Sequence, residues 1–313
     1  MRFTNTGVRL IALMAGLTLS ATACGGGDSG GGSGSGSLSG ASIIVGSKEF
    51  TESVVLGKIA ILALEDAGAT VSDKTKITGT ANTRKALTSG QVDMYWEYTG
   101  TGWTDILGHE VSQAATDEKQ LYQDVAAEDL KNGIKWFALS PANDTYAIAT
   151  TSSNPVKTLS DYAALAKSNP SDASLCAASE FLDRDDGWPG LEKAYGFALP
   201  KSNITQVDLG IVFTQVPDQS SCKFGEVFAT DGRIPANDMA VVQDDKNFFV
   251  HYNVAVTMNS DLYDKYPAVS DILSPIAEKL TTEELQKLNA EVDVDGLPTD
   301  AVAEKWLKDN NFI

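Results

Sequence analysis

Residues 42–68 read SIIVGSKEFTESVVLGKIAILALEDAG, and this stretch decides the fold class. Its first four residues, Ser42–Val45, are a short apolar run that ends at Gly46, which is typical of a buried strand. Apolar residues then recur at helical spacing from Thr51 to Ala67, and Gly68 follows where a helix would end. A strand that leads directly into a helix is the repeating unit of α/β proteins.

The same alternation continues along the chain. A second helix is predicted over Thr80–Ser89, closed by Gly90, and the next apolar run, Val92–Glu97, is predicted to be a strand. The other segments with a clear pattern are a strand at Tyr146–Thr150 and helices at Thr158–Ser168, Gly190–Tyr195 and Thr281–Ala290. Repeated strand and helix units predict an α/β fold of mainly parallel sheets flanked by helices.

The first 40 residues carry targeting signals. Arg2 and Arg9 precede an apolar run at residues 10–20. This run is too short to span a bilayer and is typical of a signal peptide. The run ends in Ala21-Thr22-Ala23-Cys24, which resembles the lipobox of bacterial lipoproteins. Residues 1–23 are therefore predicted to be removed, and Cys24 to carry the lipid that anchors the protein to the cell membrane outside the cytoplasm. The alternative is an ordinary secretory signal with an incidental cysteine.

Composition and length indicate how the chain is organised and which kinds of partner it can bind. Residues 24–40 are almost entirely Gly and Ser, so they are predicted to be a flexible linker. The remaining chain, about 270 residues, is enough for one large domain or two lobes. A formal charge of −18 argues against nucleic acid or an anionic bilayer as a binding partner. A monomer without a cofactor is expected.

The cysteines divide into two groups. Cys24 is the lipidation candidate, whereas Cys176 and Cys222 are expected to form a disulfide in an oxidising compartment. Two unpaired buried thiols are the alternative. His109 and His251 are the two histidines of the chain, and neither group of cysteines has metal-ligand spacing, so no metal site is predicted.

Three aromatic residues in four positions, Tyr95, Trp96 and Tyr98, stand out before a Thr-Gly-Thr turn at residues 99–101. Taken alone, this pattern also fits a strand with aromatic packing on both faces. This aromatic run overlaps one of six motifs that occur in order along the chain. These are Gly46–Glu52, Glu97–Thr101, Asn143–Ala147, Glu180–Arg184 with Gly190–Leu191, Thr230–Ile234, and Asp244–Phe249 leading to Tyr252–Asn253.

Through these motifs the chain resembles the glycine betaine, carnitine and choline binding proteins of ABC importers, of the ProX and OpuC type. The resemblance implies a two-lobed periplasmic-binding-protein fold, type II-like, with a ligand cleft between the lobes. One lobe is expected to contain residues 41–145 and 253–313, and the other residues 146–252. The chain would then cross between lobes near Tyr146 and Tyr252, and both cysteines of the expected disulfide would lie in the second lobe.

The resemblance also implies a ligand site. A quaternary ammonium group has no hydrogen to donate, so aromatic faces must hold it by electrostatics and dispersion. The motif positions give a cage of Tyr98, Tyr146, Phe228 and Tyr252. Members of the family more usually have Tyr at the position of Phe228, and Phe keeps the aromatic face but lacks the hydroxyl.

Polar residues complete the implied site. Lys48, Thr101 and Arg184 would bind the carboxylate of a betaine, and Asp144 would lie near the methyl groups. Taken singly, Lys48 and Arg184 would more often be surface salt-bridge members. Because choline would leave both cations without a counter-charge, the prediction favours glycine betaine or proline betaine over choline. Carnitine and ergothioneine are alternatives.

The predicted function is capture of glycine betaine or a related quaternary ammonium compound and its delivery to ABC permease subunits, for osmoprotection or nutrient uptake. A solute sensor is the alternative binding function. An exported enzyme could use paired carboxylates from Asp183, Asp185 and Asp186. Adjacent acids are more typical of a solvated turn, and no nucleophile or metal motif accompanies them, so no enzyme is expected.

Overall fold

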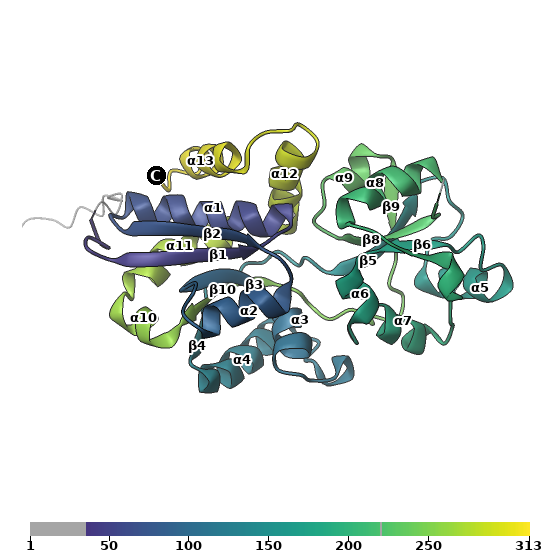
Figure 1. The fold of residues 1–313 in the computed structure, drawn as a ribbon, viewed down its shortest axis with the longest axis horizontal. Helices are drawn as coiled ribbons and strands as arrows, with labels where there is room; N and C mark the ends of the chain where they lie inside the picture. Colours follow the sequence, from purple (N-terminus) through teal and green to yellow (C-terminus); the bar gives the residue numbers. More distant parts are fainter. Residues whose placement is uncertain (1–35, 220) are drawn as a thin grey trace, which may run out of the picture. The chain divides into compact units, whose positions relative to one another are not determined.

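The computed structural model describes residues 36–219 and 221–313, and its strands form two five-stranded sheets (Figure 1). The first sheet has the order β2-β1-β3-β10-β4, with β1 at Ser42–Lys48, β2 at Thr70–Ile77, β3 at Met94–Tyr98, β4 at Ile134–Phe137 and β10 at Val254–Asn259. The second has the order β7-β6-β8-β5-β9, with β5 at Tyr146–Thr151, β6 at Leu175–Ala177, β7 at Ile204–Gln206, β8 at Phe224–Phe228 and β9 at Met239–Val242. Each sheet with the helices packed on it is called a lobe: lobe 1 for the first sheet, lobe 2 for the second.

In each sheet one strand runs against the other four. The reversed strand is β10 in lobe 1, antiparallel to β3 and β4, and β5 in lobe 2, antiparallel to β8 and β9. The other neighbouring strands pair in parallel. Each reversed strand is the one that the chain enters as it crosses from one sheet to the other. The predicted α/β fold of mainly parallel sheets is therefore confirmed, with the crossing strands as exceptions.

The helix predicted from the opening stretch is α1 (Thr51–Asp66), which packs on β1 and β2. It also packs against the three C-terminal helices, α11 (Ala268–Lys279), α12 (Thr282–Asp293) and α13 (Thr299–Asp309). The remaining helices of lobe 1 are α2 (Thr80–Thr88), α3 (Thr99–Thr101), α4 (Glu118–Asp129) and α10 (Ser260–Lys265). The helices of lobe 2 are α5 (Leu159–Ser168), α6 (Ser179–Asp183), α7 (Trp188–Tyr195), α8 (Leu209–Asp218) and α9 (Arg233–Ala236).

The Thr-Gly-Thr segment differs from its predicted conformation. It is the single helical turn α3, which continues into a π-helical turn at Gly102–Ile106, so the expected plain turn is wrong. A Cβ atom on Gly100 would lie 2.6 Å from ring atoms of Tyr252. Glycine is needed there because only a residue without a side chain lets this aromatic ring approach the helix.

Most of the N-terminal segment for which targeting signals are predicted, including the signal peptide and Cys24, lies outside the described residues. The described part of the predicted linker, residues 36–40, forms turns, and Leu38 is buried and donates its backbone N–H to Ala67. Packed structure therefore begins a few residues before Ala41, because Leu38 adds apolar area to the core around α1.

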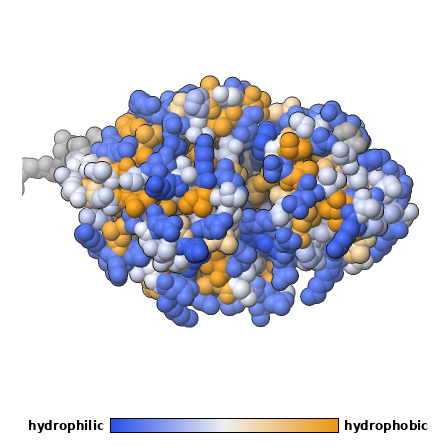
Figure 2. All heavy atoms as spheres, in the orientation of Figure 1, coloured by the Kyte–Doolittle hydropathy of each residue, from blue (hydrophilic) through white to orange (hydrophobic). Residues whose placement is uncertain are grey.

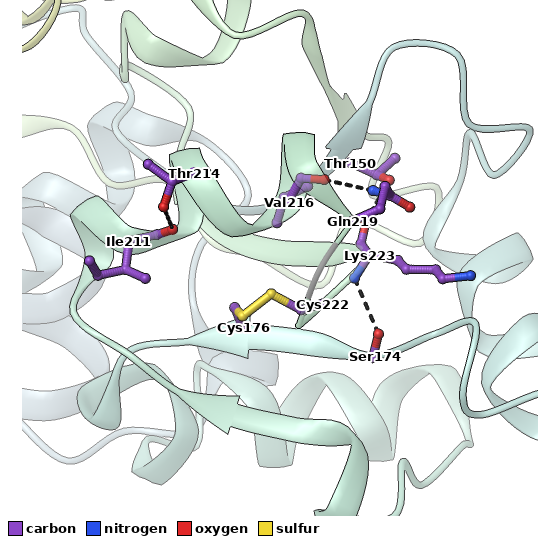
Figure 3. Close-up of a disulfide and its surroundings, with 9 residues drawn as sticks. All are labelled: Thr150, Ser174, Cys176, Ile211, Thr214, Val216, Gln219, Cys222 and Lys223. Atoms are coloured by element: carbon purple, nitrogen blue, oxygen red, sulfur yellow. Dashed lines mark hydrogen bonds between the residues drawn. A yellow bond between two sulfur atoms is a disulfide. The ribbon is translucent and has the colours of Figure 1, made fainter.

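The disulfide is present between Cys176 of β6 and Cys222 just before β8, with Cα atoms 5.6 Å apart (Figure 3). Cys176 pairs in register with Gly225 of β8, so the bond links β6 to the segment that leads into the neighbouring parallel strand. Beside it, the Lys223 backbone N–H donates to the hydroxyl of Ser174 at 3.2 Å. The bond lies wholly within lobe 2.

Hydrophilic residues cover most of the face shown in Figure 2, with hydrophobic residues in separate patches between them. Within the described ranges, none of the helices has the length and apolar character that crossing a membrane requires.

Candidate functional site

The four aromatic residues predicted as a cage meet where the chain crosses between the sheets. Tyr98 ends β3 and Phe228 ends β8, whereas Tyr146 begins β5 and Tyr252 lies two residues before β10. The Tyr146 ring centroid is 5.3 Å from that of Phe228 and 5.5 Å from that of Tyr252. Strand pairing places Tyr146 directly opposite Phe228. The two lobes thus bring these rings together.

A fifth ring, Phe50, was not singled out from the sequence. It lies immediately before α1, with its centroid 5.1 Å from Phe228 and 6.0 Å from Tyr98. Phe50 therefore connects the Tyr98 ring of lobe 1 to the Phe228 ring of lobe 2. Its signal in the sequence was its place in the motif Gly46–Glu52, but an isolated Phe before a helix is most often a core residue.

The rings line a cavity of about 950 Å³. Seven of the eight predicted ligand-binding residues line it, namely Lys48, Tyr98, Thr101, Asp144, Tyr146, Phe228 and Tyr252. The eighth, Arg184, lies behind the wall, with its guanidinium carbon 5.7 Å from the Tyr146 ring centroid. A second cavity, of about 1400 Å³, shares Tyr146 but is otherwise lined by different residues, including both histidines. The aromatic cavity, with its concentration of rings, is the better site for a cation.

Lys48 has a partner of its own in the cavity wall. Its ammonium nitrogen lies 2.6 Å from Glu97 Oε1 and 5.1 Å from the ring centroid of Tyr98. The hydroxyl of Tyr95 donates to the second oxygen of Glu97 at 2.9 Å. Lys48 is 5% exposed and Glu97 is fully buried, so each neutralises a charge that would be costly alone.

Arg184 is also paired. Its guanidinium donates through Nε to Asp186 Oδ1 at 2.7 Å and through a second nitrogen to Oδ2, and it reaches Glu180 at 3.1 Å. Burial alone would raise the pKa of Asp186, but the hydrogen bonds and charge of Arg184 outweigh it and the pKa is lowered. Asp183 and Asp185 are exposed as expected of a solvated turn, but Asp186 is buried, so that expectation is wrong for Asp186.

Asp186 and Glu180 of lobe 2 also accept hydrogen bonds from three hydroxyl groups, two of which, those of Thr104 and Thr80, belong to lobe 1. The hydroxyls of Thr104 and Tyr252 donate to Asp186 at 2.6 and 2.8 Å, and the hydroxyl of Thr80 donates to Glu180 at 2.6 Å. Tyr252 is therefore fixed in orientation by the acid that also holds Arg184. The sequence did not indicate these links, because they join segments far apart along the chain.

Two further acids lie beside the cage. Glu52 of α1 accepts hydrogen bonds from the hydroxyl of Tyr98 and the side-chain amide of Asn289, each at 3.0 Å. The hydroxyl of Thr230 donates to Asp144, whose carboxyl group also interacts directly with Glu52. Burial raises the pKa of Glu52, and burial together with the charge of Glu52 raises the pKa of Asp144 well above its usual range.

Glu226 is a third buried acid in the wall. It lies on β8 two residues before Phe228, and therefore on the same face of the strand. Its carboxylate accepts the backbone N–H of Ala178 at 2.7 Å. Burial raises the pKa of Glu226 to about 8. The cavity therefore combines aromatic faces with several acids, whereas its lysine is already ion-paired, an arrangement suited to a cationic group.

Comparison with known proteins agrees with this geometry. Residues 41–309 match the family model described as the substrate binding domain of ABC-type glycine betaine transport system. The chain is 30% identical over 277 residues to the glycine betaine-binding protein YehZ of Escherichia coli (strain K12), covering 86% of this chain and 90% of that protein.

Two other proteins are similar in structure or sequence. A crystal structure of a glycine betaine/carnitine/choline ABC transporter protein superposes with a TM-score of 0.69 at 25% identity, covering 86% of this chain and 99% of the other. The chemotactic signal transduction system substrate-binding protein CosB of Halobacterium salinarum is 26% identical over 289 residues, covering 87% of this chain and 85% of that protein. The protein therefore belongs to the family of substrate-binding domains of ABC-type glycine betaine transport systems, and has its two-lobed fold.

Proposed function

We propose that the aromatic cavity holds the quaternary ammonium group of glycine betaine or a related compound, and that the protein delivers this ligand to ABC permease subunits. The observation that carries the proposal is the contiguous set of rings, Tyr98, Phe50, Phe228, Tyr146 and Tyr252, on the wall of one cavity. Each ring face stabilises a desolvated cation by about 0.5–2 kcal/mol. Buried acids in the same wall add to this attraction.

The carboxylate of a betaine would be bound by Lys48, Thr101 and Arg184. Because Lys48 and Arg184 are already neutralised by Glu97 and Asp186, a carboxylate has to share or displace these partners. The same pairing removes the expected penalty for choline, since its hydroxyl would leave no cation unpaired. The geometry therefore supports a quaternary ammonium ligand more firmly than it supports glycine betaine over choline, carnitine or ergothioneine.

The cellular setting follows from the family and from the N-terminal motif. Members of this family act as extracytoplasmic substrate-binding components of transport systems. We infer that Cys24 carries a lipid anchor, that residues 1–23 are a signal peptide, and that the protein works as a monomer at the cell membrane. Residues 41–145 with 253–313, and residues 146–252, remain our proposal for the two domains.

A solute sensor is a second candidate, because CosB, a related protein, is named for chemotactic signal transduction. The same cavity would serve either role, since capture of the ligand precedes delivery or signalling. Co-purification with permease subunits supports the importer, whereas co-purification with a receptor and no permease supports the sensor.

Tyr146→Leu tests the cage most directly, because Tyr146 contacts both Phe228 and Tyr252. The variant is expected to weaken binding of glycine betaine and choline by about 30-fold or more, since it loses a ring face worth about 2 kcal/mol in a dry site. Tyr146→Phe is the matched control: it keeps the face and should stay within about threefold of the parent. Calorimetric titration measures both. Equal affinities for the Leu and Phe variants would remove Tyr146 from the cage.

A further inference from the structure

The carboxyl groups of Glu52 and Asp144 form a buried pair beside the cage. Both residues are 3% exposed and both line the aromatic cavity. They come from different parts of the chain, Glu52 from the first turn of α1 and Asp144 from the crossing into lobe 2. Tyr98 is the direct link to the cage, because its hydroxyl donates to Glu52.

No cation neutralises this pair within the described ranges. Lys48 is paired with Glu97, and Arg233 is paired with Asp231 and Asp293. The other charged side chains that line the cavity are acids, namely Glu49, Glu180, Asp208 and Glu226, and the hydroxyl of Tyr98 donates to Glu52. A buried carboxylate without a counter-charge is costly, so two ionised carboxylates side by side are strongly disfavoured.

The side chain of Asn289 gives independent evidence that a ligand binds beside the two acids. Its amide nitrogen donates both to Glu52 Oε2 at 3.0 Å and to the Thr230 carbonyl at 3.1 Å, which fixes the orientation of the amide. Its oxygen Oδ1 is then left buried, with no hydrogen-bond partner among the described residues. An orphaned acceptor next to two acids, in the wall of a cavity, is the environment of an absent cation or donor.

In the protein without ligand, the pair is most stable when its two carboxyl groups share one proton. The two carboxyl groups interact with each other, so one proton can be shared between them. The hydroxyl of Thr230 donates to Asp144, and the hydroxyl of Tyr98 and the amide of Asn289 each donate to one oxygen of Glu52. The pair then has one negative charge in place of two.

We propose that Glu52 and Asp144 are the counter-charge of the ligand's ammonium group, and that binding of the cation expels their shared proton. The inference rests on the proposed function, because it requires a cation in the cage. The balance is simple: the protonated pair and the permanent cation give an ionised pair, a bound cation and one proton released to the buffer. Glu52, which lies outside the residues predicted for the site, would thereby determine selectivity for permanently charged ligands.

The proposal predicts that the protein releases a proton when it binds the ligand. Titration of the protein with choline, and separately with glycine betaine, in two buffers of different ionisation enthalpy gives the number of protons released per ligand. Neither ligand titrates near neutral pH, so released protons come from the protein. About one proton is expected where the free pair is protonated, and the affinity should rise by up to about tenfold per pH unit over that range.

Variants identify the source of the proton. Asp144→Asn and Glu52→Gln each leave one titratable group fewer in the pair and should reduce the release to near zero. Glu226→Gln tests the other buried acid of the cavity, because loss of the release in that variant would assign the proton to Glu226. Glu278→Gln is the matched control: it removes an exposed acid of α11 outside the cavity and should leave the release unchanged. Proton release from the parent protein also tests the proposal by itself, because that measurement does not depend on whether a variant folds.

The outcomes separate the two claims. Binding of either ligand without proton release at any pH overturns the role of the pair and leaves the proposed function intact. Release that persists in both pair variants, or that disappears in Glu226→Gln, also overturns it. Failure to bind either ligand at any pH contradicts the proposed function and this inference together.

Discussion

Reduction of the Cys176–Cys222 disulfide is expected to lower the free energy of unfolding by up to about 4 kcal/mol. The bond closes a loop with a sequence separation of 46 residues, and opening it gives the unfolded chain more conformations. Both cysteines belong to a small core in lobe 2 with Val212, Phe213 and Val216, so lobe 2 should lose most of the stability.

Urea unfolding of the oxidised and the reduced protein measures this effect, with a non-reducing and a reducing buffer matched in every other component. The variant with Cys176→Ala and Cys222→Ala is the control, because it should unfold at the same urea concentration in both buffers. Superimposable curves for the oxidised and reduced parent protein would show that the bond contributes nothing to stability.

Glu226→Gln is expected to stabilise the protein at about pH 8 by roughly 3–5 kcal/mol, and to have little effect near pH 4. Burial raises the pKa of Glu226 to about 8 from an ordinary value of 4.5. The stabilisation from the protonated group is therefore fully present below about pH 4.5 and is lost as the pH rises to about 8, because the unfolded chain releases the proton first. Gln has no proton to lose.

Thermal or urea unfolding of both proteins across this pH range tests the sign. Glu278→Gln on α11 is the control, because Glu278 is exposed and the same substitution there should not change the slope. A decline in stability between about pH 5 and pH 8 that is as steep in Glu226→Gln as in the parent would assign the titration to another group.

Much of the fold was predictable from local pattern. The strand and helix of residues 42–68 correspond to β1 and α1, and Gly90 lies just beyond α2 with a φ of 73°, as expected of a helix-closing glycine. Thr158 and Thr281 cap α5 and α12 at the predicted starts. Local pattern failed at β2, whose alternation is weak because the strand is mostly exposed.

The site was predictable only where a motif held its residues together. Three of the cage rings fall within motifs, the fourth, Phe228, lies two residues before the motif Thr230–Ile234, and the rings meet in space. Phe50 and Glu52 belong to a motif as well, but a single Phe or Glu at a helix start is common, so nothing local distinguished them. The pairing of Lys48 with Glu97 and of Arg184 with Asp186 depends on side-chain geometry, which residue order does not give.

The central claim is that the cavity recognises a positive charge on a quaternary nitrogen and not merely its shape. The most direct measurement compares each ligand with its neutral-headed isostere, in which carbon replaces nitrogen: glycine betaine against 3,3-dimethylbutanoate, and choline against 3,3-dimethyl-1-butanol. Five ring faces and the acids of the wall predict that the charged member of at least one pair binds about 100-fold or more tighter in calorimetric titration. Equal affinity for the charged and neutral members of both pairs would contradict the account.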